Sequence, residues 1–301
     1  MSATTARASV PVAGTAAVRR GRRRIDIGRI LFWLLVVVIV VWLLFPFYWA
    51  VKSSLTPDAQ MYTTPVQYFP SHPTSQHYTD VFENNLFIQA LINSAIVGVS
   101  VTVVALTIGA SAAYVLARFN FRGRSFMMYL ILSMTMFPQI AILTALLQLV
   151  RQFGLYDTLW ALIISYMLIT LPFTVWVLAA FFRSLPAELE QAAYVDGANP
   201  FQTFYRIMLP LAAPGMVTTG LLALIAAWNE FLYAVTFEFS PNHYTVPVAI
   251  FSLTSLVPSP FAEPWGDYMA ATVVVTIPLV VLVLIFQRRI IAGMTAGAVK
   301  G

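Results

Sequence analysis

Three consecutive residues near the end of a long apolar run are of types that can bind a polar solute: Trp228, Asn229 and Glu230. Glu230 is the one charge placed well inside a predicted membrane span, where a carboxylate is costly and usually faces a cavity or a partner. The Asn229 amide can hydrogen-bond hydroxyl groups, and the Trp228 indole offers an apolar face to a ring of the solute. These residues are candidates for the wall of a translocation path. The open alternative is that Glu230 is a structural anchor, hydrogen-bonded within the helix bundle.

Other chemistries have little support in this sequence. Cysteine is absent, and His72, His77 and His243 fall in polar loops without the spacing of metal ligands, so we expect no metal site. A nucleotide-binding P-loop needs Gly-x-x-x-x-Gly-Lys-Ser/Thr, but neither Lys52 nor Lys300 is preceded by glycine. We therefore expect no ATP site of this type and no cofactor in this chain. The clustered polar residues of a membrane-bound enzyme are missing as well.

The composition places the chain in a membrane. Hydrophobic residues make up 59% of the 301 residues and charged residues only 10%, whereas soluble domains carry roughly 25% charged residues. The net charge of +5 does not indicate nucleic-acid binding, because the basic residues sit at the ends of apolar runs. Membrane lipid, and no nucleic acid, is the expected surrounding.

Six segments are long and apolar enough to cross the hydrocarbon core, which needs about 20 residues. They are Ile30–Val51, Phe87–Leu116, Ser125–Val150, Thr158–Phe182, Leu211–Phe237 and Tyr268–Gln287. The expected fold is an all-α polytopic membrane protein with six transmembrane helices. Its parts are a basic N-terminal tail (residues 1–29), a six-helix transmembrane domain (30–290) and a C-terminal tail (291–301).

The basic residues also predict the orientation of the spans. Most of the 17 lysines and arginines flank the spans on one side, and only Lys52 and Arg151 lie opposite. Because cytoplasmic loops are enriched in these residues, that side is predicted to be cytoplasmic and to hold both termini. The first span is longer than a signal-peptide core and no small-residue cleavage site follows it, so we expect a retained anchor.

A polar insert, residues 184–210, interrupts the apolar sequence between the fourth and fifth spans. Ser184 and Pro186 are predicted to start a helix, and Gly197 to end it in a left-handed conformation. Asn199–Pro200 then starts a second helix as its cap and first residue. By the distribution of basic residues, this helix–turn–helix insert lies in the cytoplasm.

The first helix of the insert suits a groove on a protein better than a membrane surface. Leu189, Ala192 and Ala193 are predicted to share one small, flat face. A helix that lies on lipid headgroups usually carries basic residues on its polar face. The charged residues of this helix are instead acidic: Glu188, Glu190 and Asp196. We therefore predict a protein partner for this helix.

The insert resembles the coupling loop of a known transporter family, the ABC-importer permeases, in which the “EAA” loop sits in a cleft of a cytoplasmic ATPase. The matching residues are Gln191-Ala192-Ala193, Gly197 and Ile207-x-Leu209-Pro210. The resemblance implies a coupling loop over residues 184–212, whose ATPase-coupling residues are Glu188, Leu189, Glu190, Gln191, Ala192, Ala193, Asp196, Gly197, Ile207, Leu209 and Pro210. Gln191 stands where the family has glutamate, so it stays open whether Glu190 supplies the charged contact.

Further segments are similar to the sugar-importer branch of that family. They are Asn93-Ser94, Ala113–Phe119, Trp228–Phe231, Trp265–Asp267 and the tail Gly293–Gly301. The resemblance implies a type I importer permease of the maltose-type second-permease group in the cell membrane. Its implied partners are a second, homologous permease subunit, two cytoplasmic ABC ATPase subunits that bind ATP and magnesium, an extracytoplasmic substrate-binding protein and a sugar substrate.

Two other functions remain as alternatives. An ABC permease of this type can carry a glycerol phosphodiester or a polyol instead of a sugar. An ion-coupled secondary transporter is the second alternative, but it would need further ionisable residues in the spans and usually shows internal repeats. Glu230 alone and the absence of an evident repeat argue against it.

Overall fold

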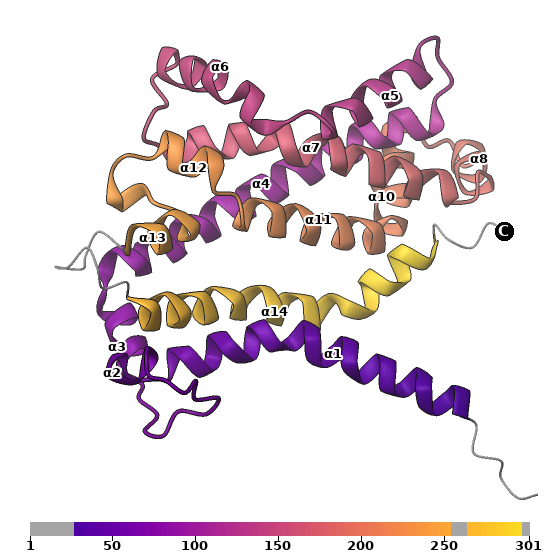
Figure 1. Cartoon of the computed structure of the whole chain (residues 1–301). Coiled ribbons are helices and arrows are strands. Elements are labelled where there is room, and N and C mark those ends of the chain that lie inside the picture. Colours follow the sequence, from indigo (N-terminus) through magenta and orange to yellow (C-terminus); the bar gives the residue numbers. More distant parts are fainter. Residues whose placement is uncertain (1–26, 254–263, 297–301) are drawn as a thin grey trace, which may run out of the picture. The chain divides into compact units, whose positions relative to one another are not determined.

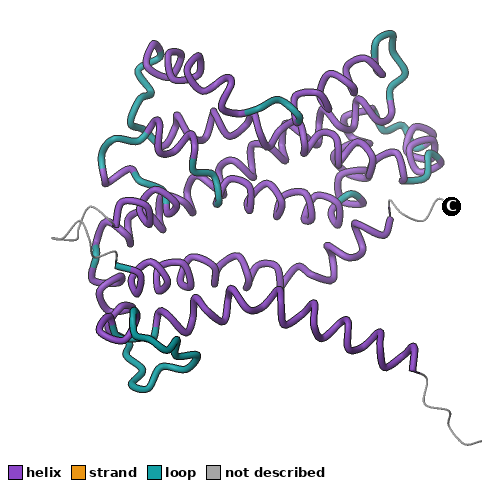
Figure 2. Tube along the Cα trace, viewed as in Figure 1, coloured by secondary structure: helices purple, strands orange, loops and turns teal. Residues whose placement is uncertain are grey.

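The computed structural model describes residues 27–253 and 264–296, and within these ranges all regular structure is helical (Figure 2). The predicted N-terminal tail 1–29 lies largely outside the described residues, whereas residues 291–296 of the predicted C-terminal tail continue α14. The chain divides into two units, residues 1–46 and 47–301, and the boundary falls inside the first helix at Pro46. The packing contacts and the candidate sites lie in the second unit.

Most of the elements are labelled in Figure 1. The described elements in chain order are α1 (Ile27–Ser54), α2 (Asp58–Met61), α3 (Gln76–Glu83), α4 (Asn85–Arg118), α5 (Arg124–Thr135), α6 (Gln139–Gln152), α7 (Leu159–Ser184), α8 (Glu188–Val195), α9 (Pro200–Thr203), the π-helix η1 (Phe204–Met208), α10 (Leu209–Leu211), α11 (Ala213–Trp228), α12 (Leu232–Phe237), the 3-10 helix η2 (Pro241–His243), α13 (Val246–Ser252) and α14 (Trp265–Ala296).

Four helices are long and apolar enough to cross a membrane unbroken: α1, α4, α7 and α14. Two more spans arise only if bent helix pairs are counted as one span each. The first pair is α5 and α6, which meet at 93°, and the second joins Pro200–Leu211 to α11 at 75°. Among the described residues the structure therefore holds four to six spans.

The third and fifth spans were predicted as continuous helices, and the structure corrects both. Ser125–Val150 is interrupted between α5 and α6, where Pro138 lacks the N–H that would continue the helix. Leu211–Phe237 is interrupted between α11 and α12, at residues 229–231. The length of an apolar run does not reveal such breaks, because it says nothing about the continuity of the helix backbone.

Helices α4 and α7 pack closely through a glycine. A Cβ added at Gly109 would lie 2.6 Å from Cγ2 of Thr174, so only glycine allows this approach. Ala105 and Ala113, which flank Gly109 at four-residue spacing, are fully buried. Small residues at four-residue spacing let two helices approach closely, and here they face α7.

One end of the second unit, which we call the α13 end, is joined by hydrogen bonds between residues far apart in sequence. The Asn93 amide of α4 donates to the carbonyl oxygens of Asn242 (2.8 Å) and Tyr244 (3.0 Å). Ser94 Oγ accepts the N–H of Val246 at 2.8 Å. The start of α4 thereby fixes the loop that leads into α13.

Asp157 makes a second link at the α13 end. Its Oδ1 accepts the backbone N–H groups of Phe239 and Ser240, both at 2.9 Å, and its Oδ2 accepts the Ser240 hydroxyl at 2.5 Å. Burial alone would raise the pKa of Asp157, but these bonds favour the carboxylate more strongly and hold its pKa well below the ordinary value. The loop before α7 is thus joined to the segment after α12.

Candidate functional site

The opposite end of the second unit, the α8 end, carries the polar insert (Figure 1). Gly197 ends α8 with φ +81°, and the N–H of Ala198 donates to the Ala193 carbonyl at 2.9 Å. These are the features of a helix C-terminus closed by a left-handed glycine. The predicted stop at Gly197 is confirmed.

The second helix of the insert also begins as predicted. Asn199 Oδ1 accepts the N–H of Gln202 at 2.8 Å, while Gln202 Oε1 accepts the N–H of Asn199 at 3.0 Å. Pro200 occupies the first turn, where its missing N–H costs nothing. This reciprocal pair is a capping box.

The predicted start of the first helix is wrong. Ser184 is the last residue of α7, and its hydroxyl donates back to the Phe181 carbonyl at 2.7 Å. A serine engaged with the preceding turn cannot cap the following one. Helix α8 starts at Glu188 after Ala187, which provides no side-chain cap.

The face predicted for α8 is wrong in one member. Ala193 is only 3% exposed, while Leu189 is 37% exposed and Ala192 also faces outward. Ala193 therefore supports α8 from below and cannot touch a docked partner. The outward residues are Val195, 87% exposed, and Phe201 of α9, 74% exposed.

The predicted acidic residues divide between the two sides of α8. Glu188, Gln191 and Asp196 are exposed, but Glu190 turns inward to α4. Its Oε1 lies 3.2 Å from Nε of Arg118, and both side chains are largely buried. Glu190 is thus already paired within the chain and does not present its charge outward.

Arg118 holds the base of α8 at two points. Besides its ion pair with Glu190, it donates from Nη2 to the Leu185 carbonyl at 2.8 Å, just after α7. Arg118 is the last residue of α4, about 37 Å along the helix from Asn93 at 1.5 Å per residue. One rigid helix therefore connects the base of α8 to the α13 end.

An aromatic cluster lies beneath the insert. The ring of Tyr114, one turn before Arg118, lies 4.9 Å from that of Phe204 in η1 and 5.7 Å from that of Phe182 in α7. Ile207 and Leu209 are half-buried and pack against the same core, whereas Pro210 is exposed. The Ile-x-Leu-Pro run therefore packs the insert against the core of the second unit.

The structure assigns a local role to the candidate path residues. Glu230 is 8% exposed, and its carboxylate accepts the N–H groups of Tyr233 (3.0 Å) and Ala234 (3.3 Å) at the start of α12. Asn229 is exposed but donates its amide N–H to the Ile225 carbonyl at 2.8 Å. Trp228 is buried at the end of α11. This favours the structural-anchor alternative for Glu230, because it caps the interrupted helix.

A cavity of about 770 Å³ lies beside this break and is lined mainly by apolar side chains. Its walls come from α5, α6, α7, α11 and α12, and include Thr135, Gln139, Thr170 and Tyr233. Trp228, Asn229 and Glu230 are not among its lining residues. The bend between α5 and α6, which the sequence did not predict, provides one side of this cavity.

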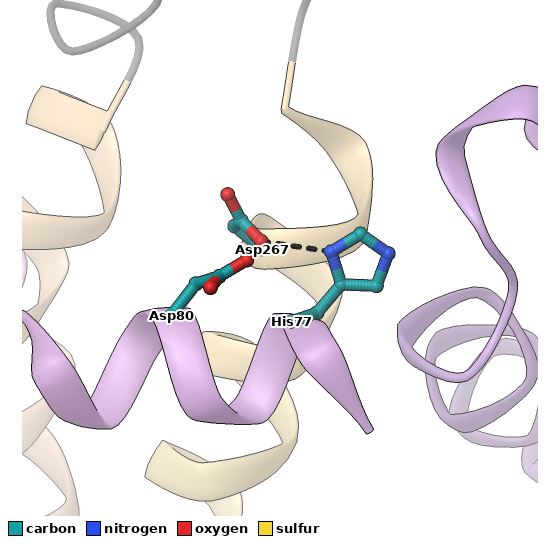
Figure 3. A group of neighbouring side chains, drawn as sticks. All are labelled: His77, Asp80 and Asp267. Atoms are coloured by element: carbon teal, nitrogen blue, oxygen red, sulfur yellow. Dashed lines mark hydrogen bonds and ion pairs between the residues drawn. The ribbon is translucent and has the colours of Figure 1, made fainter. Parts of the chain in front are cut away.

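The sequence predicted no metal site, yet the structure brings His77, Asp80 and Asp267 together (Figure 3). Both imidazole nitrogens are engaged: Nδ1 with Asp267 Oδ1 at 2.8 Å, and Nε2 with the Thr56 carbonyl oxygen at 3.1 Å. A carbonyl only accepts, so Nε2 carries a proton. Nδ1 points at the Asp267 carboxylate, so in this structure the group forms a hydrogen-bonded link between α3 and α14.

The same contacts shift the titration of His77. Burial lowers its pKa, but the hydrogen bonds with Asp267 and Thr56 and the negative charge of Asp58 outweigh burial and raise the pKa above its ordinary value. The imidazole also lies against Gly266, where an added Cβ would be 2.2 Å from the ring. A glycine at position 266 is what allows α14 to begin here.

Comparison with known proteins assigns the chain to a family. Residues 105–296, which contain α8 and the helices on both sides of it, match the family described as “Binding-protein-dependent transport system inner membrane component”. The chain belongs to this family. Membership confirms the predicted resemblance to importer permeases and the predicted multi-pass membrane location.

Relatives cover nearly the whole chain. The trehalose transport system permease protein SugB of Mycobacterium tuberculosis is 43% identical over 274 residues, covering 91% of this chain and 98% of its own length. The trehalose/maltose transport system permease protein MalG of Thermococcus litoralis is 38% identical over 276 residues, covering 91% and 97%. A chain of a bacterial ABC transporter involved in the import of the acidic polysaccharide alginate has the same fold, with a TM-score of 0.76 at 23% identity, covering 93% of this chain and 99% of its own.

Sequence reasoning missed the ion pair between Arg118 and Glu190, although both residues carried a signal. Arg118 ends an apolar span on the side where the insert lies, and Glu190 is an acidic residue on the face next to Ala193. Their separation of 72 positions hides the contact from any local spacing rule.

Proposed function

We propose that this chain is the membrane-spanning permease subunit of an ATP-driven, binding-protein-dependent carbohydrate importer, and that residues 184–210 couple it to the ATPase. The observation that carries the proposal is the surface of the insert. Val195 and Phe201 stand outward with most of their area exposed, while Glu190 and Ala193 hold the helix from beneath. A rigidly seated apolar surface of this kind is typical of a docking site.

The insert and both termini lie in the cytoplasm in this proposal. The support is the placement of basic residues, because nearly all of the 17 flank the spans on the side of the insert. Six spans follow if each bent pair crosses the membrane once. The α13 end then faces outward, toward a substrate-binding protein.

The remaining subunits supply what this chain lacks. Two cytoplasmic ABC ATPase subunits bind ATP and magnesium, and a second, homologous permease completes the path. This chain performs no covalent chemistry and has no ATP site of its own. The cargo is a carbohydrate, and trehalose is the first sugar to test, because it is named for the relatives that are 43% and 38% identical.

In the proposed mechanism, helix α4 transmits movement from the α8 end to the α13 end. When the ATPase subunits move, they displace α8, and Arg118 transmits that displacement to α4 through Glu190 and the Leu185 carbonyl. The cavity beside the breaks in the third and fifth spans is the part of the path that opens and closes. Its few polar side chains, including Gln139 and Thr170, would meet sugar hydroxyl groups.

A matched pair of valine substitutions tests the docking surface. The complete transporter is isolated through a tag on this chain, and ATPase copurification and trehalose uptake are measured. Val195→Asp should remove most of the ATPase and abolish uptake, because a charge would be desolvated at the interface. Val66→Asp, at a valine that is 57% exposed in the loop before α3, should retain the ATPase. Full copurification with Val195→Asp would refute the proposed coupling site.

A further inference from the structure

A second cavity, of about 470 Å³, lies at the α8 end of the unit. It is formed by the loop between α4 and α5, the first turns of α5 and the last turns of α7. Its lining includes two arginines, Arg124 and Arg183, and no acidic side chain. The described residues also show no ion pair for either arginine. This cavity is therefore positively charged and is separate from the α8 docking surface and from the larger apolar cavity.

The two arginines are held differently. Arg124 donates to Asn120 Oδ1 at 2.8 Å and to the Ala117 carbonyl at 3.0 Å, so its guanidinium is fixed over the end of α4. Arg183 is exposed, on the last turn of α7. A fixed and an exposed guanidinium at one cavity suit an anion with several acceptor oxygens, because each can donate to a different oxygen.

Aromatic side chains line the same cavity beside the arginines. Trp176, on α7, lies nearly two turns before Arg183 toward the interior of the span, and Phe126 and Tyr129 are exposed on α5. A free inorganic anion needs only the charged end of such a site. An amphiphile uses both ends, since its acyl chain can lie on aromatic rings that stand at a membrane interface.

We propose that this cavity binds the phosphate headgroup of an anionic phospholipid. The inference rests on the proposed orientation, in which the α8 end faces the cytoplasmic leaflet and its anionic lipids. Basic cavities between helices on that side are suited to such headgroups. The bound lipid joins the loop after α4 to the end of α7, the two elements that also hold Arg118 and the Leu185 carbonyl. It thereby stiffens the base of α8, and the composition of the membrane regulates the coupling.

Lipid retention by the intact transporter tests the proposal. The complex is purified from membranes that contain phosphatidylglycerol and phosphatidylcholine, and retained lipid is counted by native mass spectrometry. Arg183→Gln should lower phosphatidylglycerol retention about fivefold, as expected for the loss of one cationic contact. Arg122→Gln is the matched control, because Arg122 is an exposed arginine in the loop between α4 and α5 that does not line the cavity. It should retain phosphatidylglycerol normally.

The outcomes separate the lipid from a soluble anion. Equal loss in both variants, or equal retention of the two lipids by the unchanged protein, would overturn the proposal. Inorganic phosphate is added in a second arm, with thermal unfolding as the readout. If it stabilises the protein as much as phosphatidylglycerol does, and Arg183→Gln removes both effects, the site takes soluble phosphate and the lipid assignment is wrong. ATPase copurification is measured in the same samples, so failure here is distinct from failure of the coupling site.

Discussion

The side chains at the two ends of the second unit make different kinds of contact. At the α13 end, Asn93, Asp157 and His77 reach partners between 80 and 190 residues away, and each bond lies within the chain. At the α8 end, large apolar side chains of the insert stand exposed above one buried ion pair. Phe239 and Phe251 are also exposed at the α13 end, so the two ends differ in their long-range polar links and not in exposed apolar area.

This difference has a mechanical meaning. Polar links between distant segments give a loop region one defined shape, because each bond fixes the two segments that it joins. An exposed apolar surface gains free energy only when a partner covers it. We infer that the α13 end is preformed for its external contacts, whereas the α8 end gains its full stability in the assembled transporter.

The largest expected effect comes from reversing the charge at the base of α8. Arg118→Glu places two carboxylates together in a largely buried position, and should cost about 3 kcal/mol locally. Uptake should fall to background, and any remaining ATP hydrolysis should no longer respond to the binding protein. The double variant Arg118→Glu with Glu190→Arg restores the pair in reverse and should recover part of the uptake.

A neighbouring arginine provides the control for that experiment. Arg122 is exposed in the loop after α4, and Arg122→Glu should leave uptake nearly unchanged. If Arg118→Glu transports normally, the ion pair does not transmit motion. The attachment of α8 to α4 through this ion pair would then have no effect on transport.

A smaller effect, a loss of stability, is expected when a methyl group is added to the packed α13 end. Gly266→Ala would bring a methyl group within 2.2 Å of the His77 ring, which cannot retreat without losing its bonds to Asp267 and Thr56. We expect a loss of about 2 kcal/mol in unfolding free energy, read as a lower melting temperature of the purified transporter. ATPase copurification should persist, because the α8 end is untouched.

Removing a charge at the second link should cost less. Asp157→Asn keeps one acceptor oxygen but replaces the other with a donor that faces the Ser240 hydroxyl, so a loss of about 1 kcal/mol is expected. The lowered pKa of Asp157 means that its contribution is present above the ordinary value and is lost as the pH falls through the lowered value. The melting temperature of the variant should therefore approach that of the unchanged protein in strong acid. A constant gap at all pH values would contradict this account.

Much of this arrangement could be predicted from the sequence, because it rests on local signals. Apolar length located the unbroken helices, and Gly197 and Asn199–Pro200 marked the turn and restart of the insert. The face of α8 was misread because helical periodicity gives relative positions and not which side packs inward. Ala193 is small enough for either side.

The candidate path illustrates what sequence alone cannot reach. Glu230 was read as a charge in an unbroken span, for which a cavity or an anchor were equal explanations. The deciding fact is the break after α11, since it creates free N–H groups at Tyr233 and Ala234 for the carboxylate to accept. Nothing in the apolar run signals that break.

The smallest expected effect is the pH response of the His77 link. Its raised pKa means that protonation stabilises the folded state: the contribution is fully present below the ordinary value of 6.5 and is lost as the pH rises through the raised value. The melting temperature of the transporter should therefore fall by about 2 °C as the pH rises above 6.5. His77→Gln should remove this slope, while His72→Gln, at an exposed loop histidine, should keep it. If the His77→Gln variant retains the same slope, the alkaline loss arises elsewhere, and His77 contributes only neutral hydrogen bonds.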